Sequence, residues 1–128
     1  MKAVITHVAV YTENLEKMRE FYETYFNAES NQLYKNDEGF SSYFLSFGNS
    51  VRFELMSHEK LEQREVLEKV NGISHIAFSV GTRKNVLQLT ERIARDGYIV
   101  YSTPRDTGDG YFESCVSDPD GNRIEITL

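Results

Sequence analysis

Short runs of β-branched and apolar residues alternate along the chain with two stretches whose apolar residues recur at helical spacing. Residues 4–11 predict a strand, and residues 14–26 predict an amphipathic helix capped by Thr12 or Asn14. The apolar face of this helix consists of Leu15, Met18, Phe21, Tyr22, Tyr25 and Phe26. Three more strands are expected, at residues 28–34, 43–47 and 51–56. A tight turn at Gly48-Asn49 separates the last two, so the first half is predicted to be a βαβββ module.

The same order of elements returns in the second half of the chain. Residues 73–80 predict a strand, and residues 84–96 predict a helix whose C-cap is Gly97. The aligned apolar positions of this helix are Val86, Leu89 and Ile93. Three strands follow, at residues 98–102, 111–117 and 123–127, the last two joined by the turn Asp118-Pro-Asp-Gly121. Between the halves, residues 57–72 are charged and weakly helical, which predicts a solvated connector.

The two halves also repeat residue identities. Ile5-Thr-His-Val-Ala-Val10 matches Ile73-Ser-His-Ile-Ala-Phe78, and Arg52-Phe-Glu-Leu55 matches Arg123-Ile-Glu-Ile126. Each half therefore begins with a histidine and ends with a glutamate, as expected for two copies of one compact module. The predicted fold is α+β, a single domain over residues 1–128 in which two tandem βαβββ modules form a curved eight-stranded sheet arrangement. Module one covers about residues 1–56 and module two residues 73–128.

Composition and charge narrow the classes of function. The 128 residues carry a formal net charge of −6, which opposes binding to nucleic acid or to an anionic membrane surface. No apolar stretch is long enough to span a bilayer, and the first residues lack the apolar run of a secretory signal. The one cysteine, Cys115, cannot form an internal disulfide and is expected to be a small packed side chain. We expect a cytoplasmic protein whose partner is a small-molecule substrate.

The repeated histidines and glutamates are the candidate chemistry. Side chains alternate across a strand, so His7 shares a face with Ala9, and the bulky neighbours of Glu54 and Glu125 should face the helices. Both carboxylates and both imidazoles, that of His75 included, are then expected on the opposite, concave face. Two imidazoles and two carboxylates suit a divalent ion such as Zn, Ni, Mn, Fe or Co and leave two octahedral positions open. A substrate with two adjacent oxygens could chelate there while the ion stabilises an enolate.

These motifs resemble the glyoxalase and bleomycin-resistance group, also called the vicinal oxygen chelate superfamily. The resemblance covers essentially the whole chain and is carried by four motifs. They are His7 in THVAV, Glu54 in RFEL, His75 in SHIAFSV, and Glu125 at the end of Asp118-Pro-Asp-Gly-Asn-Arg-Ile-Glu125. The resemblance implies that His7, Glu54, His75 and Glu125 are the metal ligands.

Within the superfamily the His-Glu-His-Glu pattern is most like glyoxalase I, in which a metal-bound carboxylate also moves the proton. The resemblance therefore implies a metal-dependent lyase or isomerase whose base is Glu125 or Glu54. Epimerases of the group usually carry glutamine at the position of Glu54. Bacterial glyoxalase I enzymes tend to carry an arginine four residues after the first ligand, where it helps to hold the glutathione carboxylate. Here that residue is Tyr11, which favours another small oxygenated substrate.

Two other functions compete with this interpretation. The first is an Fe(II)-dependent extradiol-type dioxygenase that uses His7, His75 and Glu125 as a facial triad. The second is a non-catalytic drug- or antibiotic-binding resistance protein whose ligand lies in the groove of a dimer. A homodimer is expected whichever of the three functions holds, because each module leaves sheet edges open. The third histidine, His58, lies in the charged connector and is predicted to be solvent-exposed rather than a ligand.

Overall fold

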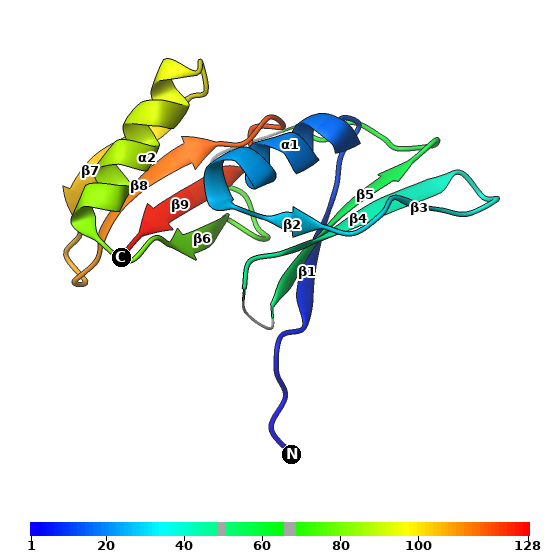
Figure 1. Cartoon of the computed structure of the whole chain (residues 1–128), viewed down its shortest axis with the longest axis horizontal. Coiled ribbons are helices and arrows are strands. Elements are labelled where there is room, and N and C mark those ends of the chain that lie inside the picture. Colours follow the sequence, from blue (N-terminus) through cyan, green and yellow to red (C-terminus); the bar gives the residue numbers. More distant parts are fainter. Residues whose placement is uncertain (49–50, 66–68) are drawn as a thin grey trace. The chain divides into compact units, whose positions relative to one another are not determined.

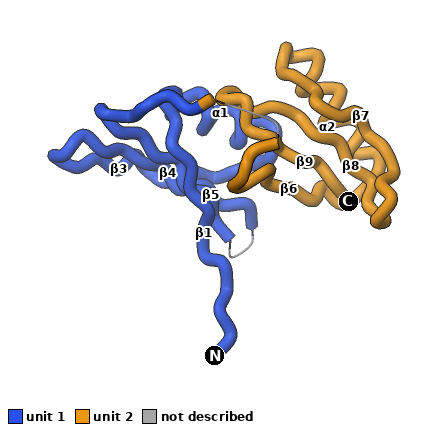
Figure 2. The backbone as a smooth tube through the Cα atoms, turned by 180° about the vertical axis from the view of Figure 1, so that it is seen from behind, with its two compact units in different colours: residues 1–64 blue, residues 65–128 orange. Residues whose placement is uncertain are grey.

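The computed structural model describes residues 1–48, 51–65 and 69–128. The chain divides into two compact units, Met1–Arg64 and Glu65–Leu128 (Figure 2). The boundary between them falls inside the predicted connector. Each unit contains one helix and one sheet (Figure 1).

The first unit is built on a mixed sheet. Its elements are β1 His7–Tyr11, α1 Leu15–Phe26, β2 Glu29–Ser30, β3 Tyr34–Lys35, β4 Phe40–Ser46 and β5 Arg52–His58. The strand order is β1-β5-β4-β2, and β3 pairs with β4 away from this path. β1 runs parallel to β5, whereas β4 and β5 are antiparallel. The two ends of the module are therefore neighbouring strands.

Helix α1 packs its apolar stripe on one face of this sheet. Met18, Phe21 and Tyr22 are buried, and the Tyr22 ring meets the Phe53 ring of β5 edge to face at 5.0 Å between centroids. Asn14 is the N-cap residue, and its amide donates to Thr12 Oγ1 at 2.9 Å. The helix ends at Asn27, a left-handed residue with φ 52°, which turns the chain back toward the sheet.

The second unit repeats this plan. Its elements are β6 His75–Ser79, α2 Arg83–Arg95, β7 Val100–Asp106, β8 Phe112–Ser117 and β9 Arg123–Thr127. The strand order is β6-β9-β8-β7, and β6 runs parallel to β9. Thr82 caps α2 by accepting from the Asn85 amide at 3.1 Å. Asp96 is the C-cap residue, and the predicted stop, Gly97, follows it with φ 96°.

The structure confirms the predicted α+β fold of two tandem βαβββ modules, and β9 has the predicted bounds. The predicted strand at residues 28–34 is instead two short strands, β2 and β3, so the described residues contain nine strands rather than eight. The predicted turn has Gly48 at φ 80°, while Asn49 lies outside the described residues.

The connector prediction needs correction. β5 continues through His58, so the half-buried His58 belongs to the sheet and not to a solvated connector. Residues 59–65 and 69–72, the described remainder of the connector, contain no helix. Within the part of the chain that the structure describes, neither helix is long and apolar enough to cross a membrane.

Candidate metal centre

In each unit the predicted glutamate lies on the sheet face opposite the helix, which we call the open face. Phe53 and Leu55 are buried on the helix side of β5, and the half-buried Glu54 lies between them. In β9, Ile124 and Ile126 are fully buried and flank the half-buried Glu125 in the same way. The predicted alternation of faces is confirmed for both glutamates.

The strand register places the histidines on the same open faces. In the first unit His7 pairs with Arg52, and Ala9 pairs with Glu54. In the second unit His75 pairs with Arg123, and Ala77 pairs with Glu125. Each histidine therefore lies diagonally across a parallel strand pair from the glutamate of its own module, and the two units share this register residue for residue.

The pair in the second unit is in direct contact. His75 Nε2 lies 3.0 Å from Glu125 Oε2, and Ser74 Oγ lies 3.1 Å from His75 Nδ1. Burial raises the pKa of the Glu125 carboxyl, His75 opposes that shift, and the nearby carboxylate of Glu113 adds to it. A carboxylate with a raised pKa is a stronger base than an ordinary glutamate.

The histidine of the first unit is held in a comparable way. Thr6 Oγ1 lies 3.1 Å from His7 Nδ1, the same contact that Ser74 makes in the second unit. The His7 ring also meets the Phe44 ring edge to face, at 5.5 Å between centroids. A hydroxyl on Nδ1 fixes the ring orientation and leaves Nε2 as the nitrogen available to a ligand.

Each unit supplies one imidazole nitrogen and one carboxylate, a mixed N/O pair of donors that suits a divalent ion. The structure brings His75 and Glu125 together, and it places His7 and Glu54 on adjacent strands of one open face. Among the residues described, no three or more His, Cys, Asp or Glu side chains gather closely enough to hold an ion. The four-ligand set therefore stays a prediction.

An arginine stacks on an aromatic ring beside each pair. Arg52 lies over the Phe44 ring at 4.3 Å, and Arg123 lies over the Tyr101 ring at 4.2 Å. Arg123 also approaches the Sγ of Cys115 at 4.0 Å. The prediction of a packed cysteine is confirmed, and burial raises the pKa of its thiol, which makes it a poor nucleophile.

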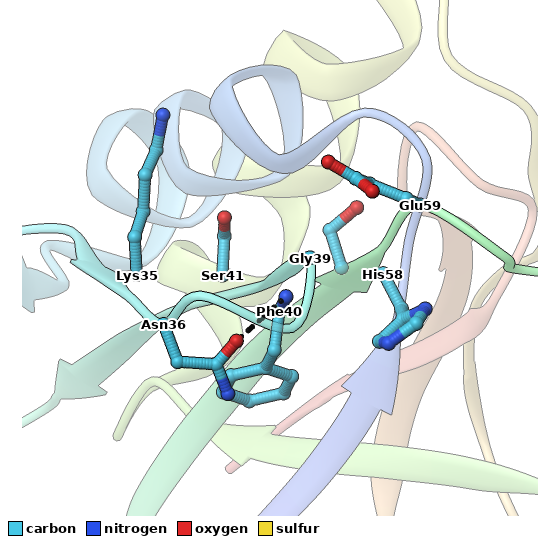
Figure 3. Close-up of a pocket in the computed structure, with 8 residues that line it drawn as sticks. Lys35, Asn36, Gly39, Phe40, Ser41, His58 and Glu59 are labelled. Carbon is cyan, nitrogen blue, oxygen red and sulfur yellow. Dashed lines mark hydrogen bonds between the residues drawn. The ribbon is translucent and has the colours of Figure 1, made fainter.

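A pocket of about 240 Å³ lies at the far end of the first sheet (Figure 3). It is lined by Lys35, Asn36, Gly39, Phe40, Ser41, Ser57, His58 and Glu59, and it contains none of the four predicted ligands. His58 accepts at Nδ1 from the Lys60 amide at 3.0 Å. The prediction put His58 in the charged connector, although it follows Glu54 and Met56 at the two-residue spacing of one strand face.

Comparison with known proteins agrees with this architecture. The chain belongs to the Glyoxalase/Bleomycin resistance protein/Dioxygenase superfamily, whose family model matches residues 4–126. This confirms the resemblance found in the sequence. The chain is also 28% identical over 126 residues to the uncharacterized protein YqjT of Bacillus subtilis (strain 168), with 94% of each chain covered.

Two solved structures show the shared fold. A glyoxylase/bleomycin resistance protein/dioxygenase domain from Frankia sp. EAN1pec has a TM-score of 0.84 at 18% identity, covering 100% of this chain and 98% of that one. Glyoxalase I from Zea mays has a TM-score of 0.80 at 21% identity, covering 96% of this chain. The match spans 43% of the maize chain, less than half its length. At these identities the likeness concerns the fold.

Proposed function

We propose that this protein is a metal-dependent lyase or isomerase resembling glyoxalase I, acting on a small molecule with two adjacent oxygens. The observation that carries the proposal is the contact of 3.0 Å between His75 Nε2 and Glu125 Oε2 on the open face. The same register recurs for His7 and Glu54 in the other module. The superfamily match and the glyoxalase I fold support this reaction class.

In this proposal His7, Glu54, His75 and Glu125 hold the ion, which is Zn, Ni, Mn, Fe or Co. When bound, the ion acts as a Lewis acid that polarises the substrate oxygens and so acidifies the neighbouring C–H. Thr6 and Ser74 contact the two imidazoles at Nδ1, which leaves the Nε2 atoms for the ion. This arrangement fixes the ligands before the substrate arrives.

Glu125 is the first choice for the group that moves the proton, with Glu54 as the other candidate. The Glu125 carboxylate is partly buried and has both an imidazole and a second carboxylate, Glu113, beside it. Partial burial shields the carboxylate from water, so it can take a proton from one carbon of the substrate and return it to the next. Glu54 has the matching place in the other module.

The protein is also proposed to act as a homodimer. Among the described residues, β1 and β6 are edge strands: β1 pairs only with β5, and β6 pairs only with β9. A free strand edge presents unpaired N–H and C=O groups, and a second copy of the chain would pair them.

The proposal is tested by elemental analysis of the purified protein and of His75→Ala and Glu54→Gln variants. We expect about one ion per site in the wild type and a 10- to 100-fold or larger loss of metal affinity in the variants. His58→Ala is the matched control, because it removes a histidine outside the ligand set and should keep the metal.

Activity is then measured with hemithioacetals of glutathione and of smaller thiols. Isomerisation or lyase turnover that a chelator abolishes would support the proposal. Metal-free protein even after reconstitution would refute it, and oxygen uptake with iron alone would indicate a dioxygenase instead.

A further inference from the structure

A row of side chains crosses four strands of the first sheet, next to the row that contains Glu54. The register pairs Tyr11 of β1 with Met56 of β5, and it pairs Met56 with Ser42 of β4. Ser42 in turn pairs with Tyr34 of β3. Directly paired residues of neighbouring strands point to the same face, so all four share the open face with Glu54. We call Tyr11, Met56, Ser42 and Tyr34 the aromatic row.

The aromatic row presents ring surface to the outside. Tyr11 and Tyr34 are each 55% exposed, and the Phe40 ring lies 6.2 Å from the Tyr34 ring. Ser42 is only 4% exposed, so the larger side chains around it close over it. Tyr11 and Tyr34 therefore expose ring surface on the open face, on strands to either side of the half-buried Met56.

The second unit lacks this feature at the matching positions. There the register pairs Ser79 with Thr127, and Thr127 with Glu113. The two sheets share strand order and register, so the fold itself accepts small and charged residues at these positions. The aromatic row is therefore not required for the stability of the module.

The position of the aromatic row beside Glu54 indicates its function. Met56 follows Glu54 on the same face of β5 after one intervening residue, a step of about 7 Å along the strand. When the two oxygens of a substrate are chelated beside Glu54, the first substituent of that substrate extends over about this distance. Aromatic side chains gain stacking energy against a flat ring in addition to the burial of apolar area.

We infer that the aromatic row binds an aryl group of the substrate, which makes the substrate an aromatic compound with two vicinal oxygens. The inference rests on the proposed function, because it needs the oxygens to be chelated beside Glu54. Tyr11 and Tyr34 flank the ring and Met56 lies beneath it. Tyr11 is thus a specificity residue in the place where bacterial glyoxalase I enzymes tend to carry an arginine.

The test compares two chelators that share one metal-binding group. Benzohydroxamate and acetohydroxamate each present two vicinal oxygens, and they differ in a phenyl against a methyl group. Calorimetric titration of the zinc- or nickel-loaded protein should show benzohydroxamate binding about tenfold or more tightly than acetohydroxamate. This preference should fall to about twofold or less in Tyr11→Ala and in Met56→Thr, with acetohydroxamate affinity unchanged.

Tyr111→Ala is the matched control. Tyr111 is 54% exposed, like Tyr11, but lies in the second unit outside the row, so its loss should leave the preference intact. Tyr11→Phe keeps the ring and should keep the preference as well. Because Tyr11 is exposed, its variants should fold, and their circular dichroism spectra and melting temperatures check this.

Three results would overturn the inference. Equal binding of both hydroxamates, still dependent on metal, would exclude the aryl site and leave the proposed function intact. Absence of metal-dependent binding of either hydroxamate would overturn the proposed function and this inference with it. A change of molar mass by light scattering in Tyr11→Ala, with the phenyl preference kept, would make the row a contact between copies of the chain.

Discussion

The two units have the same arrangement of strands and helix, but the side chains that pack them together differ. Both place their first and last strands in parallel with a shared register, and both put a histidine and a glutamate on the open face. Their helix interfaces differ. In the first unit the interface is aromatic, with Tyr22 against Phe53, whereas in the second Thr90 Oγ1 and Ser114 Oγ meet at 2.7 Å. Strand pairing and the His–Glu positions are the same in both units, while the packing around them differs.

The open faces differ as well. The first unit carries the aromatic row beside Glu54, and the second carries the Glu113 carboxylate beside Glu125. The His–Glu pair is common to the two open faces, and the residues beside it are not.

The largest effect is expected from the helix interface of the first unit. Phe53→Ala removes a 4%-exposed ring that packs on Tyr22, so the free energy of unfolding should fall by about 3–5 kcal/mol. Chemical denaturation measures this loss. At the helix interface of the second unit, Thr90→Val keeps the volume and removes hydrogen bonds to Ser114 and Val86, for a loss of about 1–2 kcal/mol. Equal losses in the two variants would contradict the proposed difference between the interfaces.

The next effect concerns the turn before the last strand. The Asp118 carboxylate is 1% exposed and accepts from the amides of Asp120 and Asn122 and from Asn122 Nδ2, all within 2.9 Å. Asp118→Ala leaves these part-buried donors without the carboxylate and should lower the free energy of unfolding by about 2–4 kcal/mol. Asp120→Ala is the control, since its backbone amide remains and the loss should be small. Indistinguishable melting temperatures for the two variants would argue against this role of Asp118.

The smallest effect tests the charged contacts that hold α1. The Tyr43 hydroxyl donates to Glu16 Oε1 at 2.6 Å, and this bond, followed by Arg19, lowers the pKa of Glu16. A lowered folded pKa contributes stability that is present above the unfolded pKa and is lost on acidification through the folded pKa. Tyr43→Phe should therefore cost about 0.5–1 kcal/mol at pH 7, with a smaller difference below about pH 4.5.

Urea denaturation of wild type and Tyr43→Phe at pH 7 and pH 3 measures this dependence. Thr90→Val is the neutral counterpart from the second unit, and its loss should be the same at both pH values. A pH-independent loss in Tyr43→Phe would show that Glu16 does not contribute through its charge.

Much of the fold could be predicted because its signals are local. Alternation along residues 51–56 and 123–127 placed both glutamates on the face away from the helices, and the structure agrees. Helical spacing located both helices to within a residue at each end. The division of residues 28–34 into β2 and β3 could not be predicted, because it depends on which segments of β4 each strand meets.

The sequence by itself determined the duplicated module, the face of each strand and the four candidate ligands, because period-two alternation and internal repetition are properties of the chain alone. The tertiary structure decided which side chains meet. It brought His75 to Glu125 across two strands nearly fifty residues apart, made His58 part of the sheet, and aligned Tyr34 with Tyr11. Such contacts depend on strand register, which is set by pairing between distant segments and leaves no local mark in the sequence.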